Sequence, residues 1–224
     1  MTAIFCQDLS KSYGHYQVLD GISLTIQEGE CFALFGPNGA GKTTLLKILA
    51  TLLRPSEGHY EILGMDGLKE KEAIRANIMF LAHGAHLYDD LNAKENLEFA
   101  LALRGLSPTQ HEIKLALDRV AIGAFAEMKV RNYSAGMKKR LALAKAMLVK
   151  PKVLLLDEPF AALDTAGTEI MREYIRERLS EHSAVLMSTH DREKARPISS
   201  RAGMLRQGTL QEISIEALHS DDLF

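Results

Sequence analysis

Hydrophobic residues concentrate in short runs that alternate with amphipathic stretches. Three of these runs have the length and the apolar character of buried strands: residues 31–35, 153–156 and 184–188. A glycine-rich turn and a helical pattern through about Leu53 follow the first run. This order of strands and helices predicts an α/β domain built around a largely parallel sheet.

Two regions depart from that order. The polar–apolar alternation over 22–26, between turn signals, predicts antiparallel strands that flank the core sheet. From 89 to 150, leucine and alanine recur at helical spacing and no strand pattern is present. We interpret 89–148 as a helical insertion, because a continuous α/β domain would need strands there. Ser107 followed by Pro108 predicts the N-cap and first position of one of its helices.

The composition narrows the class of protein. The 224 residues are 46% hydrophobic and 25% charged, which is typical of one folded domain and excludes disordered, collagen-like and repeat-array chains. Lysine and arginine number 27 against 29 acidic residues, so the basic excess of nucleic-acid-binding proteins is missing and we expect no nucleic-acid partner. Cys6 and Cys31 form neither a zinc motif nor a disulfide framework, which favours a reducing, cytoplasmic setting.

Neither a membrane span nor an export signal is recognisable. No apolar run reaches the length of about 18 residues that a spanning helix needs. The first eight residues lack the basic and apolar regions of a signal peptide. We therefore expect any membrane association to be made through a partner.

A glycine-rich motif follows the first predicted strand. Residues 36–43 match the phosphate-binding loop G-x-x-x-x-G-K-[ST], in which glycines let backbone N–H groups approach phosphate oxygens and the next helix adds its positive end. Lys42 is expected to reach the β- and γ-phosphates, and the Thr43 hydroxyl to bind Mg²⁺. The predicted nucleotide-binding residues are Gly36, Pro37, Asn38, Gly39, Ala40, Gly41, Lys42, Thr43 and the adjacent Thr44.

Two adjacent acids, Asp157 and Glu158, end the apolar run 153–156. Carboxylates at the end of a buried strand are costly to desolvate unless they meet a cation or a reacting group. Because a phosphate loop precedes them in the chain, we predict that Asp157 holds Mg²⁺ and that Glu158 polarises an attacking water. A plain surface turn is the alternative.

The segment 132–141, Asn-Tyr-Ser-Ala-Gly-Met-Lys-Lys-Arg-Leu, opens a helical pattern that Ser134 would N-cap. Taken with the two motifs above, it resembles the ABC ATPase family across essentially the whole chain. Ser134, Ala135, Gly136 and Met137 then occupy the place of the family's LSGGQ signature in a diverged form. The resemblance implies that this signature faces the γ-phosphate bound by an opposite subunit, in a sandwich dimer of two copies that bind ATP and Mg²⁺.

The resemblance also implies roles for other residues. Tyr13 is similar to the aromatic residue that stacks on adenine, and His190 to the switch histidine that contacts the γ-phosphate. Glu158 and His190 are thus the expected catalytic residues. Ala162, Leu163 and Asp164 resemble the D-loop, which crosses the dimer interface.

The implied fold is an α/β P-loop NTPase (ABC ATPase) core with an N-terminal antiparallel β subdomain and an inserted all-helical subdomain. Within a single nucleotide-binding domain over 1–224, the core and β subdomain would comprise 1–88 and 149–224. The helical, signature-bearing subdomain would comprise 89–148.

His83 departs from the family pattern, which has at this place a glutamine that contacts Mg²⁺ and the water. An imidazole can form one such hydrogen bond or bind a metal, but with a shorter reach. Either His83 substitutes for the glutamine, or metal contact is weaker and hydrolysis is slower or more dependent on a partner.

The segments 81–83 and 87–97 look like those of the ATP-binding subunits of the cytochrome c maturation system, which handles haem. That resemblance implies integral membrane partner subunits and a position on the inner face of the cell membrane. The alternative is the ATPase of a drug, lipid or peptide exporter. A non-transport ABC ATPase would usually carry tandem domains or basic tails, and a non-hydrolytic module would not need Asp157, Glu158 and His190 together.

Overall fold

The computed structural model of the chain describes residues 1–82 and 87–215. The strands, in chain order, are β1 Thr2–Tyr13, β2 Tyr16–Gln27, β3 Cys31–Phe35, β4 Glu57–Ile62, β5 Met65–Asp66, β6 Ile78–Leu81, β7 Val153–Asp157, β8 Ala184–Ser188, β9 Arg201–Arg206 and β10 Thr209–Ile213. The helices are α1 Lys42–Leu49, α2 Lys71–Asn77, α3 Ala93–Ala102, α4 Gln110–Arg119, α5 Ala135–Val149, α6 Thr165–Ser180 and α7 Arg192–Ala195, with the 3-10 turns η1 Gly123–Phe125, η2 Val130–Asn132 and η3 Arg196–Ile198.

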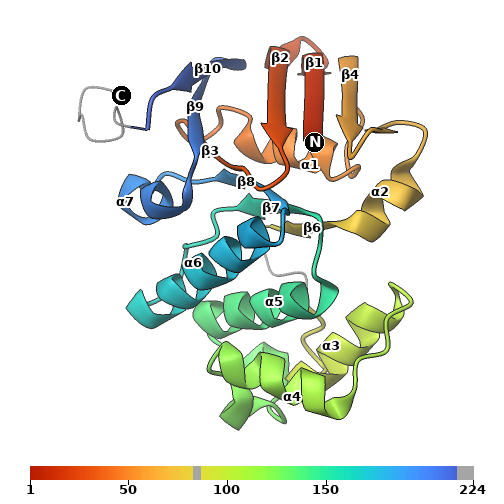
Figure 1. Cartoon of the computed structure of the whole chain (residues 1–224), viewed down its shortest axis with the longest axis vertical. Helices are drawn as coiled ribbons and strands as arrows, with labels where there is room; N and C mark the ends of the chain where they lie inside the picture. Colours follow the sequence, from red (N-terminus) through yellow and green to blue (C-terminus); the bar gives the residue numbers. More distant parts are fainter. Residues whose placement is uncertain (83–86, 216–224) are drawn as a thin grey trace.

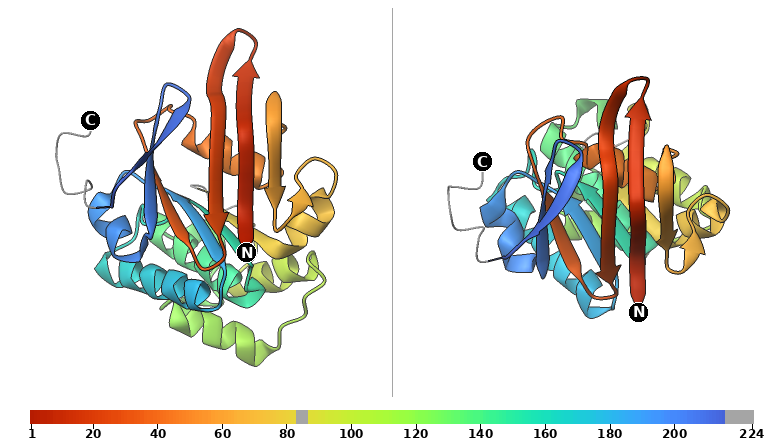
Figure 2. Two further views of the ribbon diagram at one scale, coloured as in Figure 1. Left: turned by 45° about the horizontal axis from the view of Figure 1, so that its top comes forward. Right: turned by 90° about the horizontal axis from the view of Figure 1, so that it is seen from above.

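The strands form two sheets. The larger has the order β10-β9-β3-β8-β7-β6, and it is parallel except for β10, which pairs antiparallel with β9. The smaller is antiparallel with the order β2-β1-β4-β5, and its long β1–β2 hairpin projects past β4 (Figure 2). The α/β fold class predicted for the chain, with an antiparallel sheet near its N-terminus, is confirmed.

The central strands supply side chains to two separate cores, one on each face of the parallel sheet. In β3, the odd-numbered residues face the core beneath α5 and α6, whereas Phe32 and Leu34 face α1 and the antiparallel sheet. Strands β7 and β8 alternate in the same way. Figure 1 shows the resulting layers, with α1 on one side of the sheet and α5 and α6 on the other. Burial on both faces explains why β3 is continuously apolar, and why β7 and β8 are apolar up to their last residues, Asp157 and Ser188.

The chain between 89 and 150, all of which is described, is helical as predicted. Its one β interaction is an isolated bridge between Asn92 and Lys129. Ser107 does not cap a helix, because α4 has Thr109 as its N-cap. The Thr109 hydroxyl accepts from the Glu112 N–H (3.2 Å), and the Glu112 carboxylate accepts from the Thr109 N–H (2.8 Å). An ionised glutamate gives Thr109 the stronger capping box, so the helix begins after Thr109 and not after Ser107.

Helix α1 ends earlier than the pattern through Leu53 indicates. It stops at Leu49, and Thr51 takes a left-handed backbone conformation with φ +61°. Arg75 holds this turn, since its Nε donates to Thr51 Oγ1 (2.7 Å) and its Nη2 to the Thr51 carbonyl (3.0 Å). A tertiary contact therefore overrides the helical periodicity.

Both cysteines are buried and unpaired, in different cores. Burial raises the pKa of each thiol, Cys6 and Cys31, to about 12, so both stay protonated and unreactive at neutral pH. Within the described residues, no helix combines the length and apolarity needed to cross a membrane.

Candidate functional site

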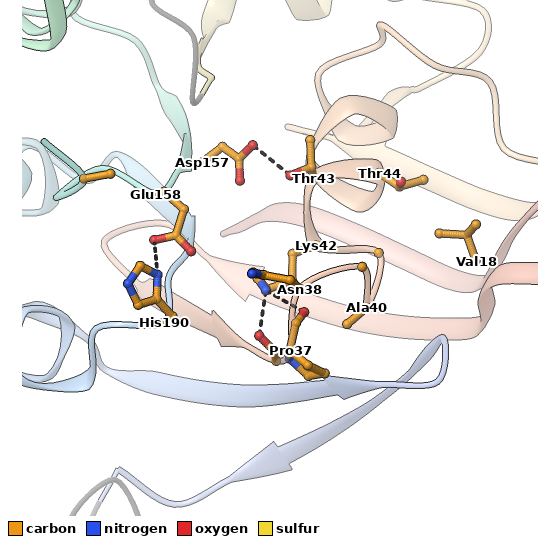
Figure 3. Close-up of a pocket in the computed structure, with 14 residues that line it drawn as sticks. Val18, Pro37, Asn38, Ala40, Lys42, Thr43, Thr44, Asp157, Glu158 and His190 are labelled. Carbon is orange, nitrogen blue, oxygen red and sulfur yellow. Dashed lines mark hydrogen bonds and ion pairs between the residues drawn. The ribbon is translucent and has the colours of Figure 1, made fainter. Parts of the chain in front are cut away.

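Three segments that lie far apart in the sequence meet at one edge of the parallel sheet. The loop 36–43 follows β3, Asp157 ends β7, and His190 comes just after β8. Because β3, β8 and β7 are parallel neighbours, their carboxyl ends open onto one crevice. The pocket there has a volume of about 850 Å³ (Figure 3), and it is lined by Val18, Gly36, Pro37, Asn38, Gly39, Ala40, Gly41, Lys42, Thr43, Thr44, Asp157, Glu158, Ala161 and His190.

The loop 36–43 presents the N-terminus of α1 to this pocket. Gly41 is the N-cap of α1 in a left-handed conformation (φ +105°), and no side chain caps the helix. The first N–H groups of α1 therefore remain available to an anion, and the helix dipole adds positive potential. This arrangement suits a phosphate group.

Lys42 is almost fully buried, with 8% of the residue exposed. Its ammonium donates to the carbonyl oxygens of Gly36 (2.6 Å) and Pro37 (3.0 Å), as Figure 3 shows. Burial lowers the pKa of Lys42, while the negative charges of Glu158 and Asp157 act in the opposite direction. The ammonium is thus held over the loop, beside the acids, where a phosphate chain would lie.

Gly36 tolerates no side chain. A Cβ at this position would lie 2.3 Å from the backbone oxygen of Leu205, and the residue has φ +148°. We expect Gly36→Ala to lower the free energy of unfolding by about 2–3 kcal/mol, because the clash is with backbone in a packed region. Gly39→Ala, where φ is +83° and the Cβ would meet nothing within 4 Å, is the matched control and should cost about 1 kcal/mol. Urea unfolding measures both; equal losses would contradict the steric explanation.

Asp157 is buried and accepts two hydroxyl hydrogen bonds. Thr43 Oγ1 donates to Oδ2 (2.8 Å), and Ser188 Oγ donates to Oδ1 (2.6 Å). The Thr43 hydroxyl and the Asp157 carboxylate are hard oxygen ligands at the pocket wall, which fits Mg²⁺ that is shared with phosphate oxygens and water. Among the described residues no cluster of three or more His, Cys, Asp or Glu could hold a metal alone.

Glu158 and His190 lie side by side at the pocket, in direct contact with each other (Figure 3). His190 Nδ1 lies 3.0 Å from Glu158 Oε2, with His190 mostly exposed and Glu158 mostly buried. Glu158 takes a left-handed backbone conformation, φ +50°, which is uncommon for a residue with a side chain. Its N–H donates to the carbonyl of Ser188 (3.0 Å). The carboxylate can accept a proton from a water molecule in the pocket, and the imidazole can orient the carboxylate.

The signature residues lie outside this pocket. Ser134 caps α5, accepting from the Met137 N–H (3.2 Å), and both Ser134 and Ala135 are exposed. Gly136 packs against the D-loop, since a Cβ there would lie 2.7 Å from the Ala162 oxygen. The D-loop residues Ala162, Leu163 and Asp164 do not line the pocket either.

Arg140 strengthens the contact between α5 and the D-loop. Its Nη2 donates to Asp164 Oδ1 (2.6 Å), and Asp164 also caps α6 by accepting from the Gly167 N–H (2.8 Å). The signature and the D-loop of one chain therefore form a single surface.

Tyr13 is not among the residues that line the pocket. It is half-exposed in the β1–β2 hairpin, with Lys11 Nζ 5.0 Å from its ring centroid. Val18 lines the pocket on that side. His83 lies outside the described residues.

Sequence reasoning missed three residues of this site. Ser188 had a usable signal, because it ends an apolar run of strand length just before His190, and the structure pairs it in register with Asp157. Val18 and Ala161 are small apolar residues with no motif of their own, and only the folded arrangement brings them to the pocket.

Comparison with known proteins gives consistent matches over most of the chain. Residues 19–161 match the family model described as ABC transporter. The uncharacterized ABC transporter ATP-binding protein YxlF of Bacillus subtilis is 40% identical over 206 residues, which cover 91% of this chain and 68% of that protein. The daunorubicin resistance ATP-binding protein DrrA3 of Streptomyces coeruleorubidus is 34% identical, over 96% of this chain and 71% of its own.

A solved structure is similar to this chain over nearly its whole length. A dimeric ATP-binding cassette in a post-hydrolysis state, bound to ADP and phosphate, superposes with a TM-score of 0.87 at 27% identity. The match covers 95% of this chain and 98% of that chain.

Proposed function

Because this chain belongs to the ABC transporter family of ATP-binding proteins, we propose that two copies close around two ATP molecules and drive the membrane subunits of a transporter. The chain is an ABC-type ATPase with the P-loop NTPase fold of that family. One observation carries the proposal: the phosphate loop, Asp157, Glu158 and His190 line one pocket, whereas the signature lies outside it.

The position of the signature supports the sandwich dimer. The N-terminus of α5, capped by Ser134, is exposed instead of covered by its own chain. Ser134 accepts from one N–H group of the first turn, and the other N–H groups there and the helix dipole would favour an anion such as a phosphate. A second copy would supply that phosphate, and the similar cassette solved as a dimer is consistent with this arrangement.

Hydrolysis at the pocket would proceed mainly by positioning and charge neutralisation. On binding ATP, the Lys42 ammonium would exchange the carbonyls of Gly36 and Pro37 for β- and γ-phosphate oxygens. Mg²⁺, held by Thr43 and Asp157, would neutralise charge on those phosphates. Glu158 would accept the proton of the attacking water.

His190 would act beside Glu158. Its Nδ1 lies 3.0 Å from Glu158 Oε2. Both ring nitrogens donate only in the charged imidazolium, so in that form Nδ1 would donate to Glu158 and Nε2 to a γ-phosphate oxygen. The imidazole would thereby couple the presence of the γ-phosphate to the orientation of the carboxylate.

A second hollow, of about 730 Å³, offers a docking place for a membrane subunit on the inner face of the membrane. It lies between α2, β6 and α3, and among its lining residues are Leu52, Tyr88, Leu103 and Leu106. Leu52 and Leu103 are 61% and 70% exposed, and with the other apolar lining residues they form a contiguous apolar surface of the kind that marks interaction sites. An apolar helix of the partner would fill this hollow.

We expect Leu103→Glu to abolish co-purification with the membrane subunit, because a charge would be buried at the contact. Leu115→Glu, an equally polar change on exposed α4 outside the hollow, is the matched control and should leave co-purification intact. ATP turnover of the isolated subunit should be unchanged in both. Retention of the partner by the Leu103 variant would contradict this docking place.

The finer proposal is the cytochrome c maturation system, supported by the segments 81–83 and 87–97. The relatives described above are not named for that system. DrrA3 is named for daunorubicin resistance, which favours a drug exporter as the second candidate.

Deleting the gene separates the two candidates. Loss of covalent haem from c-type cytochromes, measured by haem staining, supports the first. Normal haem staining together with increased drug sensitivity contradicts the first and supports the exporter.

A further inference from the structure

Lys139 is a buried lysine in the first turns of α5, two residues beyond the signature. Only 4% of it is exposed, and within the described part of the chain it forms no ion pair with a carboxylate. Its neighbour Lys138 behaves as a surface lysine, pairing with Asp89 at 2.7 Å. A buried ammonium without an ion-pair partner is costly, so its presence needs a reason.

The ammonium of Lys139 points at the backbone between the two site acids. Its Nζ lies 3.4 Å from the carbonyl oxygen of Asp157. Burial lowers the pKa of Lys139, and the charges of Asp157 and Glu158 oppose that shift. The cation therefore lies beside the acid pair.

The peptide group that joins Asp157 to Glu158 is held from both sides. Its carbonyl faces Lys139 of α5, and its N–H donates to the carbonyl of Ser188 in β8 at 3.0 Å. The next residue along, Glu158, has φ +50°, a conformation that persists only where its surroundings enforce it. The direction of the Glu158 side chain depends on the orientation of this one peptide group.

We propose that Lys139 is a positioning residue for Glu158. It fixes the Asp157–Glu158 peptide so that the carboxylate stays aimed at the attacking water, and it ties that peptide to the helix that carries the signature. This inference rests on the proposed hydrolysis at the pocket. Through the Lys139 side chain, a shift of α5 caused by nucleotide contact at Ser134 would also reach Glu158.

Removal of the Lys139 charge should lower turnover without lowering stability. If Lys139 only supported the fold, its removal would lower the melting temperature. A buried, poorly paired charge can instead be replaced by an apolar group of similar length with little loss, or with a gain, in stability. A positioning role therefore predicts a loss of turnover without a loss of stability.

The test compares Lys139→Met, Lys139→Arg and Lys145→Met in the full chain. Lys145 lies on the same helix and its pKa is also lowered by burial, but its charged neighbour is Arg104 and not a carboxylate. We expect Lys139→Met to lower kcat for ATP at least about tenfold, with KM for ATP changed less than about twofold. Its Tm should be equal to or higher than that of the wild type. Lys139→Arg, which keeps a cation, should retain more turnover than Lys139→Met, and Lys145→Met should keep the wild-type kcat.

The contrary outcomes are distinct. A fall in Tm that accompanies the fall in kcat, an unchanged kcat in Lys139→Met, or equal losses in the Met and Arg variants would each overturn the role of Lys139. Glu158→Gln serves as the reference: if it hydrolyses ATP as fast as the wild type, the proposed function itself fails, and the role of Lys139 with it. A normal defect in Glu158→Gln beside full activity in Lys139→Met removes only the positioning role.

Discussion

Glu158→Gln is expected to lower kcat for ATP by about 10²–10³-fold while leaving KM nearly unchanged. The amide has the shape of the carboxylate and can keep a contact with His190, which lies 3.0 Å from Glu158 Oε2. It cannot accept a proton from water, so the chemical step is slowed and nucleotide binding is not. Steady-state phosphate release at saturating ATP and Mg²⁺ measures the effect.

The same variant tests the dimer. With hydrolysis slowed, ATP should accumulate between two closed copies, and sedimentation should show a dimer that the wild type forms only briefly. Glu193→Gln, the same change at an exposed acid of α7, is the control and should leave both turnover and association as in the wild type. Equal rates of phosphate release in Glu158→Gln and wild type would refute the role of the carboxylate.

Lys42→Met should weaken ATP binding by about 100-fold, close to 3 kcal/mol, because the phosphates lose their one charge-assisted side-chain contact in the loop. The fold should survive, since the Lys42 ammonium is bonded to the carbonyls of its own loop and not to another element. Equilibrium binding of a fluorescent ATP analogue reports the affinity. Lys47→Met on the exposed face of α1 controls for loss of a positive charge on that helix. Unchanged affinity in Lys42→Met would mean that the loop binds phosphate through its backbone alone.

The sequence was most informative where one physical constraint acts on a whole segment. Strands β3, β7 and β8 are buried on both faces, so they are apolar apart from Asp157 and Ser188 at the ends of β7 and β8, and such runs are recognisable without the structure. The loop 36–43 is recognisable for a similar reason, because close approach of backbone to phosphate demands glycine at fixed spacing. These features, with the acids that end β7, predicted the α/β core and most of the pocket.

The sequence was least informative where a contact between distant residues decides the outcome. Thr51 leaves the helical conformation because Arg75 binds it, and no local pattern reports that contact. Lys139 resembles any lysine of an amphipathic helix until the fold places it beside Asp157. Val18 lines the pocket and Tyr13 does not, in a hairpin whose register has several irregularities that the sequence does not reveal.

The packing of the signature against the D-loop has a consequence for the proposed pair of ATP sites. Gly136 has no room for a side chain beside the Ala162 oxygen, and Arg140 joins the same helix to Asp164. In a two-fold sandwich, the signature would serve the nucleotide of the other copy, while the D-loop follows a chain's own Glu158. If the signature of one chain moved away from the phosphate bound by the other copy, the D-loop beside that chain's own Glu158 would therefore move as well. Closure and turnover would then require both ATP molecules, so occupancy of one site alone would give neither a closed dimer nor full turnover.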